Sequence, residues 1–536
     1  MDPLISRELS RLDPAVPFRA SSGHLHSTWA KTFFSRPELY VRPQSIPEVQ
    51  KLVTLARRCR RRLVTVGSGH SPSDLTCTSS WLVNLDDFQK VLSIDESTRT
   101  VTVEAGIRLS ELGNRLEEHG LTLPNLGSID SQSIAGVIAT GTHGSSLRHG
   151  LLSECIESLR LVLPNGQLVR CGATNNPSLF RAALISLGAL GIIVEVTFKA
   201  RPVFNIAWRQ ERYSLTQVLN EWSAGLWTSH EFVRVWWLPY EKGAIVWRAD
   251  PTDRPLQAPP KNFYGEWFGY HIYHNLLALS SYFPRILPWV EWFVFGLQYG
   301  FRPGRTVTEA VEPSRTGLLM NCLDRSNPLL QQGLVGALPR RGASLGLHQE
   351  FQPRPFLDPT CDDGPTLYLN ATLYRPYLRD PPCYLRYYEA FEWLMRDMGA
   401  RPHWAKNFKT LDSTELHRLY RENMDEWMKV REEVDPEGMF LGEWHRRNLP
   451  FLRHGKSSDD QLPLLEGEKE RRIFDRRVAG DGMEWIGEER WRGPSVENSR
   501  ALPDPASSPT AASEESFDLL AKGEASIVLP DTMLGV

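Results

Sequence analysis

The chain has 536 residues, of which 41% are hydrophobic and 23% are charged, proportions typical of soluble globular proteins. This composition excludes a fibrous protein, a mostly disordered chain and a polytopic membrane protein. The net charge of −3 gives no basic excess of the kind that nucleic-acid-binding proteins carry. The 7 cysteines are scattered without CxxC or zinc-ligand spacing, which predicts isolated thiols in a reducing compartment and no metal site.

The two ends of the chain differ from its middle. Near the N-terminus, Asp2, Glu8 and Asp13 interrupt the apolar residues, which argues against a secretory signal and against a cleaved mitochondrial presequence. Near the C-terminus, charged stretches alternate with Pro, Ser and Ala, and few apolar residues are available for burial. We therefore predict a disordered tail over residues 455–536.

The first two hundred residues alternate irregularly between helix and strand patterns. Ser45 followed by Pro47 and Glu48 is typical of a helix start, and Asn165-Gly166 between two apolar runs is typical of a tight hairpin. In chain order, the patterns predict a helix over 46–59, strands over 62–66, 81–85, 91–94 and 100–105, a helix over 109–119, a hairpin of strands 159–163 and 167–171, and a strand over 192–198. This mixture predicts an α+β fold and not a doubly wound parallel sheet.

The stretch 264–301 is the most apolar and aromatic part of the chain. Arg285 and Glu291 interrupt it, and no run reaches the roughly 18 residues that a membrane-spanning helix needs. One interpretation is a buried pair of helices. The other is a surface that dips into a membrane interface, with Trp289 and Trp292 at the level of the lipid headgroups.

The first glycine-rich segment is VGSGHS at residues 66–71, directly after a predicted strand. Successive main-chain N–H groups in such a turn form an anion-binding nest that suits a pyrophosphate. The spacing is not GxGxxG and no acidic residue follows at the Rossmann distance, so NAD is disfavoured. The candidate ligand residues are Gly67, Ser68, Gly69, His70 and Ser71.

The second glycine-rich segment covers residues 125–146. Its glycines permit close approach of a ligand to the main chain, and its short polar side chains offer contacts. The glycines are Gly127, Gly136, Gly141 and Gly144, and the polar residues are Ser128, Ser131, Thr140, Thr142 and His143. Either segment alone could consist of ordinary tight turns, but the two together on one α+β unit predict a cofactor cradle.

Four further motifs accompany these loops: TWAKTFFSRPELYVRPQSIPEV from residue 28, GALGIIVEVTF at 188–198, HWAKNF at 403–408 and DPEGMFLGEWHRR at 435–447. Together they resemble the sugar-1,4-lactone oxidases among the vanillyl-alcohol-oxidase-like flavoproteins, and the last two resemble the fungal arabinonolactone oxidases. The resemblance covers roughly residues 25–450. It implies an N-terminal segment over 1–35, an FAD-binding domain of the PCMH type over 36–203, and a substrate-cap and C-terminal domain over 204–450.

The resemblance also implies roles for single residues. His70 lies where many of these oxidases join the ring to the flavin 8α-methyl group, although a histidine of a phosphate loop without that bond is the alternative. Ile193 lies in the strand that closes the FAD site. Lys406 would lie by the flavin N1/C2 carbonyl and stabilise negative charge, and His403 would contact the lactone or donate to the flavin.

The implied reaction oxidises an aldono-1,4-lactone at C2 and yields a dehydro-lactone of the erythroascorbate type and H2O2. Gly127 stands where plant dehydrogenase relatives carry Ala, and the open space favours O2 as the acceptor. A dehydrogenase that passes electrons to another acceptor is the alternative. The resemblance further implies attachment to the mitochondrial outer membrane, with a cytoplasmic location otherwise.

One segment departs from the family pattern. Similar proteins carry a Glu-x-Arg pair on a strand that orients the lactone and assists proton removal, and residues 324–353 contain no such pair. Either a local splice or frame error alters this translation or the substrate strand has been lost. The second possibility leaves open a flavin-binding protein without turnover.

Overall fold

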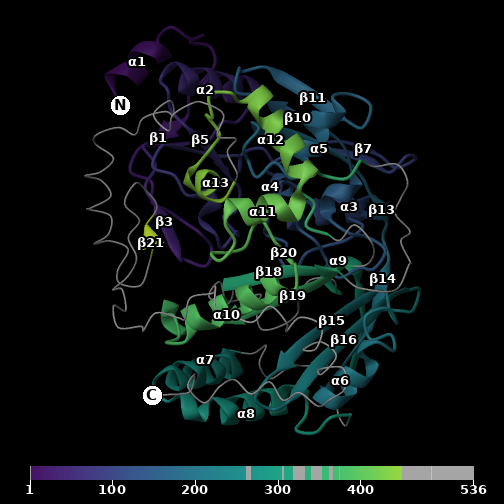
Figure 1. Cartoon of the computed structure of the whole chain (residues 1–536). Helices are drawn as coiled ribbons and strands as arrows, with labels where there is room; N and C mark the ends of the chain where they lie inside the picture. Colours follow the sequence, from purple (N-terminus) through teal and green to yellow (C-terminus); the bar gives the residue numbers. More distant parts are fainter. Residues whose placement is uncertain are drawn as a thin grey trace. The chain divides into compact units, whose positions relative to one another are not determined.

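The computed structural model describes residues 2–260, 267–304, 307–317, 332–339, 353–360, 366–373, 375–449 and 484–485 (Figure 1). Its contacts divide the chain into two compact units. The first unit comprises residues 1–144, 148–204 and 314–494, and the second comprises residues 145–147, 205–313 and 495–536. Every candidate site residue named above belongs to the first unit.

The first sheet of the first unit has the order β1-β4-β6-β5, with β4–β6 and β5–β6 parallel. Its strands are β1 (Ala20–Ser21), β4 (Leu39–Val41), β5 (Leu63–Val66) and β6 (Trp81–Asn84). Helix α2 (Ile46–Arg58) connects β4 to β5. The Ser45 hydroxyl accepts the N–H of Glu48 at 3.4 Å and caps this helix, while Val49, Leu52 and Val53 form its buried face. The predicted helix and both predicted strands are confirmed.

The second sheet is antiparallel, with the order β11-β10-β12-β8-β7. Its strands are β7 (Val91–Asp95), β8 (Thr100–Glu104), β10 (Ile156–Val162), β11 (Leu168–Gly172) and β12 (Ile192–Lys199). The β10–β11 hairpin turns at Asn165-Gly166, where Gly166 has a φ of +83° that favours glycine. Helix α3 (Leu109–Glu118) is followed by Gly120 at φ +66°. These elements are also confirmed, and parallel pairing in one sheet beside antiparallel pairing in the other gives the expected α+β fold.

The first unit also contains several short elements that the sequence patterns do not predict. They are α1 (Pro3–Leu9), β2 (His26–Ser27), β3 (Phe33–Ser35), η1 (Asp74–Thr76), β9 (Leu121–Thr122), α4 (Ile134–Ala139), η2 (Leu152–Cys155), α5 (Pro177–Ala183), β13 (Arg201–Pro202), α9 (Ser314–Gly317) and η5 (Pro376–Leu378). Of the predicted disordered tail, only Glu484–Trp485 lies within the described residues, and it forms β21, parallel to β3.

The C-terminal helices α11 (Ser413–Tyr420), α12 (Glu422–Val434) and α13 (Glu443–Asn448) pack against the N-terminal part of the same unit (Figure 1). Trp427 Nε1 donates to the carbonyls of Ala182 and Ile185 at 3.3 and 3.2 Å. His445 Nε2 donates to the Leu187 carbonyl at 2.8 Å. The chain therefore returns after residue 314 to the unit in which it began.

A three-stranded sheet of the first unit has the order β19-β18-β20, and helix α10 (Tyr384–Asp397) packs against β18 and β19 (Figure 1). The strands are β18 (Gln332–Pro339), β19 (Thr366–Leu373) and β20 (Arg401–Pro402). Strand β18 lies inside the atypical segment 324–353, so a strand is present between β19 and β20. Its sequence, QGLVGALP, contains no ionisable residue.

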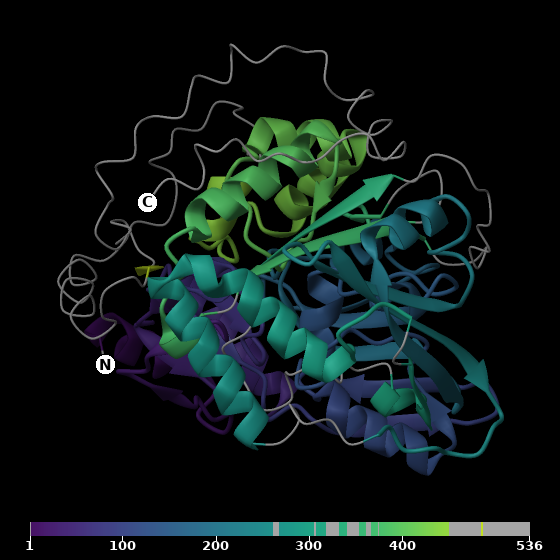
Figure 2. The same ribbon diagram turned by 90° about the horizontal axis from the view of Figure 1, so that it is seen from below.

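The second unit is built on an antiparallel sheet with the order β15-β16-β14-β17. Its elements are β14 (Asn205–Ser214), α6 (Leu215–Trp222), β15 (Phe232–Leu238), β16 (Gly243–Thr252), α7 (Trp267–Tyr282), η4 (Pro284–Ile286), α8 (Leu287–Tyr299) and β17 (Val307–Pro313). Helices α7 and α8 lie side by side (Figure 2), as the helix-pair interpretation predicts. Burial is only partial, because Val290 and Val294 are buried whereas Trp289 and Trp292 are exposed. No helix among the described residues is both long enough and apolar enough to span a bilayer.

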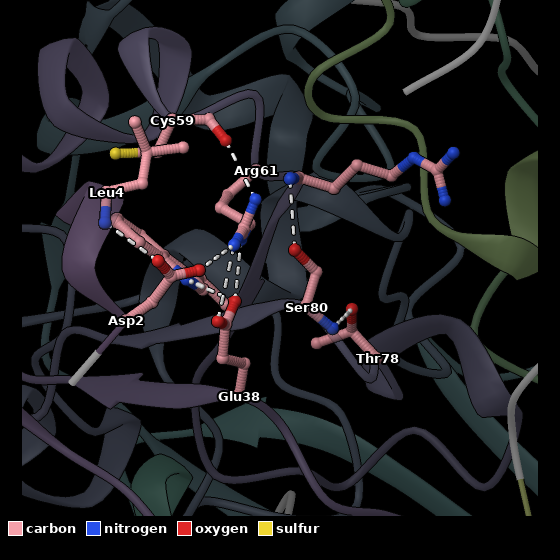
Figure 3. Close-up of polar contacts among 9 residues, drawn as sticks. Asp2, Leu4, Glu38, Cys59, Arg61, Thr78 and Ser80 are labelled. Atoms are coloured by element: carbon pink, nitrogen blue, oxygen red, sulfur yellow. Dashed lines mark hydrogen bonds and ion pairs between the residues drawn. The ribbon is translucent and has the colours of Figure 1, made fainter. Parts of the chain in front are cut away.

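Arg61 ties the N-terminal helix to the first sheet (Figure 3). Its guanidinium donates to Glu38 at 2.7 Å, to Asp2 at 2.9 Å and to the Cys59 carbonyl at 2.8 Å. The side chains of Arg61 and Glu38 are only 8% and 11% exposed, so removal of the cation leaves a nearly buried carboxylate without its counter-charge.

We expect Arg61→Ala to lower the free energy of unfolding by about 3 kcal/mol in chemical denaturation. The matched control is Arg57→Ala on α2. Arg57 pairs with Glu437 while both side chains are about half exposed, and such pairs contribute about 0.5 kcal/mol. Equal losses in the two variants would contradict the assignment.

Candidate functional site

The loop at residues 66–71 turns sharply after β5 and packs against the second glycine-rich segment. A Cβ atom on Gly67 would stand 2.1 Å from Ser133 Oγ, and Gly69 has a φ of +69°. The Gly67 carbonyl accepts from Asn84 Nδ2 at 3.3 Å, and the Gly69 carbonyl accepts from the Trp29 N–H at 2.7 Å. Glycine is therefore needed at both positions, and the loop is held in a defined shape.

Arg108 places a positive charge beside this loop. Its Nη1 would lie 3.7 Å from a Cβ atom on Gly67. Nη2 pairs with Asp86, while Nη1 is buried and has no hydrogen-bond partner among the described residues. A buried guanidinium N–H without a partner is costly, and a phosphate oxygen is a geometrically suitable acceptor for it. This donor, next to a glycine turn that a Cβ would fill, fits the pyrophosphate of FAD.

His70 connects the two glycine-rich segments. Its Nδ1 lies 2.6 Å from Ser68 Oγ, and its Nε2 lies 3.1 Å from Ser131 Oγ in the second segment. The Trp29 ring stacks on the imidazole with 5.7 Å between centroids. Burial and the positive charges of Arg108 and Lys406 lower the pKa of His70 to about 4. The imidazole is therefore neutral at physiological pH and retains a nucleophilic nitrogen lone pair.

The second segment contains α4 and a closely packed turn around Asn125. A Cβ atom on Gly144 would stand 1.9 Å from Asn125 Oδ1, and Asn125 Nδ2 donates to the carbonyls of His149 and Gly150. Gly127 is less tightly enclosed, since a Cβ atom there would lie 3.1 Å from Thr142 Cγ2. The close approaches in this segment are thus unequal, and Gly144 tolerates a side chain least.

His143, Tyr368 and His403 bring strand β19 and the HWAKNF segment to this site. The Tyr368 ring stacks on His143 with 3.4 Å between centroids and 7° between planes, and the rings of His143 and His403 lie 5.5 Å apart. His143 Nδ1 lies 3.0 Å from the Gly144 carbonyl, which can only accept, so Nδ1 carries the proton. His403 is the opposite tautomer, because its Nδ1 accepts from the Ala405 N–H at 3.1 Å. Neutral His143 therefore has an acceptor at Nε2, whereas neutral His403 has a donor there.

The charge at this site comes from Lys406. Its main-chain N–H donates to the His403 carbonyl at 2.9 Å. Burial and the neighbouring His143 and Lys406 lower the pKa of His403 well below its ordinary value. The same ammonium group also lowers the pKa of His70, so its positive charge acts on both histidines. Trp404 and Phe408 are buried on either side and anchor the segment.

The structure thus gathers six of the predicted site residues into two groups. Ser68, His70 and Ser131 form one hydrogen-bonded group, and His143, His403 and Lys406 form a second group that Lys406 couples to His70. Other predicted residues lie outside these two groups. Ser71 is half-buried, and Ser128 and Gly136 are exposed. The Thr140 hydroxyl donates to the Gly136 carbonyl, Gly141 has a φ of +70°, and Ile193 is buried in β12 opposite Leu161.

Four residues at the site were not predicted from the sequence: Trp29, Arg108, Ser133 and Tyr368. No local sequence pattern distinguishes Arg108 from the other arginines or Tyr368 from other tyrosines in strands. Trp29 lies in the TWAK motif and Ser133 in the second glycine-rich segment, so the motifs enclosed them without indicating their contacts.

Two known family profiles match this chain. The profile of the FAD binding domain family matches residues 37–172, and the profile described as D-arabinono-1,4-lactone oxidase matches residues 196–327 and 342–448. The unmatched residues between the two parts of the second profile lie in the atypical segment. They include the whole of β18, so the departure seen in the sequence coincides with this strand.

Three fungal relatives cover most of the chain. A Neurospora crassa protein that carries the name D-arabinono-1,4-lactone oxidase provisionally is 49% identical over 89% of this chain and 94% of its own length. The D-arabinono-1,4-lactone oxidase of Yarrowia lipolytica is 38% identical over 79% of this chain and 97% of its own. The D-arabinono-1,4-lactone oxidase of Saccharomyces cerevisiae is 36% identical over 80% of this chain and 96% of its own length.

Solved structures confirm the fold class. Cholesterol oxidase from Brevibacterium sterolicum has a TM-score of 0.63 at 16% identity and covers 82% of this chain and 99% of its own. BBE-like 1 of Physcomitrella patens has a TM-score of 0.59 at 16% identity, and the match covers 84% of this chain and 100% of that protein. At such low identity the likeness shows the fold alone. The predicted FAD-binding fold of the vanillyl-alcohol-oxidase type is therefore confirmed.

Proposed function

Since this chain belongs to the D-arabinono-1,4-lactone oxidase family, we propose that it oxidises D-arabinono-1,4-lactone, or a similar aldono-1,4-lactone, at C2. The acceptor is O2, and the products are dehydro-D-arabinono-1,4-lactone and H2O2. Bound FAD supplies the hydride acceptor for this reaction. The observation that carries the proposal is the hydrogen bond from the second glycine-rich segment to His70, with Lys406 beside it.

The two glycine-rich segments would hold the cofactor. The turn from Gly67 to Ser71, with Arg108 beside it, suits the pyrophosphate, since its shape is fixed before binding. The second segment supplies small residues over which a ligand can approach the main chain, namely Gly127, Ser128, Ser131, Gly136, Thr140, Gly141, His143 and Gly144. Ile193 contributes an apolar wall from β12. Gly127 leaves room that a side chain would take up, since a Cβ atom there would lie 3.1 Å from Thr142 Cγ2, and its lack of a side chain supports O2 as the acceptor.

His70 is the proposed site of covalent attachment to FAD. Such a bond would join an imidazole nitrogen to the 8α carbon in place of one C–H and one N–H, and O2 would take up the two hydrogens and two electrons as H2O2. The depressed pKa supports this role, because only a neutral imidazole offers the required lone pair.

Lys406 and His403 are the proposed catalytic residues. The Lys406 ammonium group would stabilise the negative charge that the flavin ring gains when it accepts hydride, and a fixed charge of this kind acts without reorganisation. His403 is fixed as a neutral Nε2–H donor by the Ala405 N–H on its Nδ1. It can therefore orient a lactone oxygen or a flavin carbonyl, but it cannot accept a proton at Nε2 in this tautomer.

The atypical segment favours one alternative reading of the same site. Strand β18 is present but offers neither the carboxylate nor the guanidinium of a Glu-x-Arg pair. A protein with this strand could bind FAD and bind lactone poorly or turn it over slowly. This alternative shares the cofactor site with the oxidase and differs from it only in the reaction with lactone.

Anaerobic mixing of the purified yellow protein with D-arabinono-1,4-lactone and with L-gulono-1,4-lactone tests the proposal. We expect loss of the visible flavin absorbance, because the bound flavin becomes reduced, and its return with H2O2 formation after air is admitted. Bleaching without peroxide would indicate a dehydrogenase. Yellow protein that no lactone bleaches would indicate flavin binding without turnover, and colourless protein would refute the cofactor site.

We further propose that the protein attaches peripherally to the mitochondrial outer membrane through helices α7 and α8. Trp289 and Trp292 are 50% and 43% exposed on α8, and Tyr282 and Phe283 are 67% and 61% exposed at the turn between the helices. Large aromatic side chains of this kind favour the headgroup region of a bilayer. Without such attachment the protein would be cytoplasmic.

Flotation with phosphatidylcholine vesicles tests the membrane proposal. We expect the parent protein to float and the double variant Trp289→Ser/Trp292→Ser to bind about tenfold more weakly, because two apolar side chains leave the interface. The control is Trp237→Ser on β15, which removes an equally exposed Trp outside the helix pair. Unchanged flotation of the double variant would place the contact elsewhere.

A further inference from the structure

Helix α10 carries a buried carboxylate to which the proposed reaction gives no role. Glu392 is 9% exposed, and its Oε2 accepts hydrogen bonds from the main-chain N–H groups of Lys409 and Thr410, each at 2.7 Å. Burial raises the pKa of Glu392, and the two hydrogen bonds and the Lys409 charge oppose the rise. Because a carboxylate in such surroundings needs donors of this kind, the two bonds form a strong connection between α10 and the chain after Phe408.

That part of the chain is the end of the HWAKNF segment. On its N-terminal side, Trp404 Nε1 donates to the Leu357 carbonyl at 2.8 Å, and the Lys406 N–H donates to the His403 carbonyl at 2.9 Å. On its C-terminal side, Glu392 binds the next two residues after Phe408. Lys406 therefore lies on a turn that is attached to the protein at both ends.

Side-chain packing and hydrogen bonds both hold the C-terminal end of this turn, where Phe408 is buried. A hollow of about 30 Å³ lies beside it, and Phe391, Met395 and Phe408 are among the residues that line it. Side chains that border empty space can shift at little cost, because few contacts are lost. The two hydrogen bonds, in contrast, have defined lengths and directions, so they fix the main chain at Lys409 and Thr410.

We infer that Glu392 is a positioning residue for Lys406: its carboxylate fixes the main chain after Phe408 and thereby holds the Lys406 ammonium group at the reacting centre. The inference rests on the proposed role of Lys406. It predicts that loss of Glu392 acts only through Lys406, and this separates it from a general contribution of α10 to stability.

Three variants of the holoenzyme test the inference. In Glu392→Ala, we expect flavin reduction by lactone about tenfold slower, with FAD still bound and with a KM for lactone that changes less than kcat. The midpoint potential of the bound FAD should shift to a more negative value, because the ammonium charge is less well placed. Glu392→Gln should restore most of the rate, since its amide oxygen can accept both N–H groups. Glu389→Ala, one turn earlier on the same helix, is the control and should leave both quantities unchanged.

The double variant Glu392→Ala/Lys406→Ala gives the decisive comparison. If Glu392 acts through Lys406, the double variant should match Lys406→Ala in rate and potential. Additive losses, or an unchanged potential in Glu392→Ala, would overturn the inference. The midpoint potential is measured without lactone, so it tests the inference even if the protein does not turn lactone over. Failure of the inference is thereby distinguished from failure of the proposed function.

Discussion

Lys406→Ala is expected to keep its FAD and to lose about 100-fold in the rate of flavin reduction by lactone. The reason is electrostatic: the charge of the ammonium group acts on both His70 and His403, and no neutral side chain replaces a fixed charge in a site shielded from water. The measurement is anaerobic stopped-flow absorbance with D-arabinono-1,4-lactone. Lys406→Arg should recover part of the rate, since it keeps the charge but not the shape.

The control for this experiment is Lys429→Ala. Lys429 is an exposed lysine of α12 in the same unit, so its loss removes one positive charge at the surface. An equal rate in Lys406→Ala and in the parent would remove Lys406 from the mechanism. Loss of FAD in Lys406→Ala would instead assign the residue to cofactor binding.

His70→Ala is expected to abolish covalent attachment of FAD. Acid precipitation of the parent protein should leave the yellow colour in the pellet, whereas the variant should release it into the supernatant. His119→Ala is the control, because His119 is a surface histidine paired with Glu96. A colourless pellet from the parent protein would show that FAD is bound without a covalent bond.

The pH dependence of attachment follows from the same histidine. Burial and the charges of Arg108 and Lys406 lower the pKa of His70 to about 4, so the imidazole is neutral above this pH and protonated below it. Attachment of FAD to the apoprotein should therefore proceed equally well from about pH 6 to pH 8 and decline only as the pH falls toward about 4. A decline centred near the ordinary histidine pKa of about 6.5 would contradict the buried environment.

The atypical segment limits what the family resemblance can predict for this chain. Strand β18 has register partners along the whole of β19, so the main chain of the sheet is continuous. Its sequence nevertheless lacks any group that could accept the proton of the lactone hydroxyl. Turnover of lactone is consequently separable from the binding of FAD in this protein.

Local chemistry allowed the sequence to predict the α+β class and most elements of the first two hundred residues. The Ser45 cap, the Asn165-Gly166 turn and Gly120 after α3 each act within a few residues of the element they define. The glycine-rich segments were predicted for the same reason, since tight turns and close main-chain approaches require glycine wherever they occur. The helix pair α7–α8 was predicted, but the exposure of Trp289 and Trp292 depends on packing and could not be read from composition.

The sequence by itself determined the family, the cofactor class and the segments that form the site, because these depend on residue types at short spacing. Only the tertiary structure decided that Ser131 bonds His70, that Tyr368 stacks on His143, that Arg108 stands beside Gly67, and that Glu392 holds the chain after Phe408. Each of these contacts joins residues far apart in the sequence, and their partners are selected by packing and by the demand that buried polar groups be satisfied. No periodicity or motif encodes such a choice.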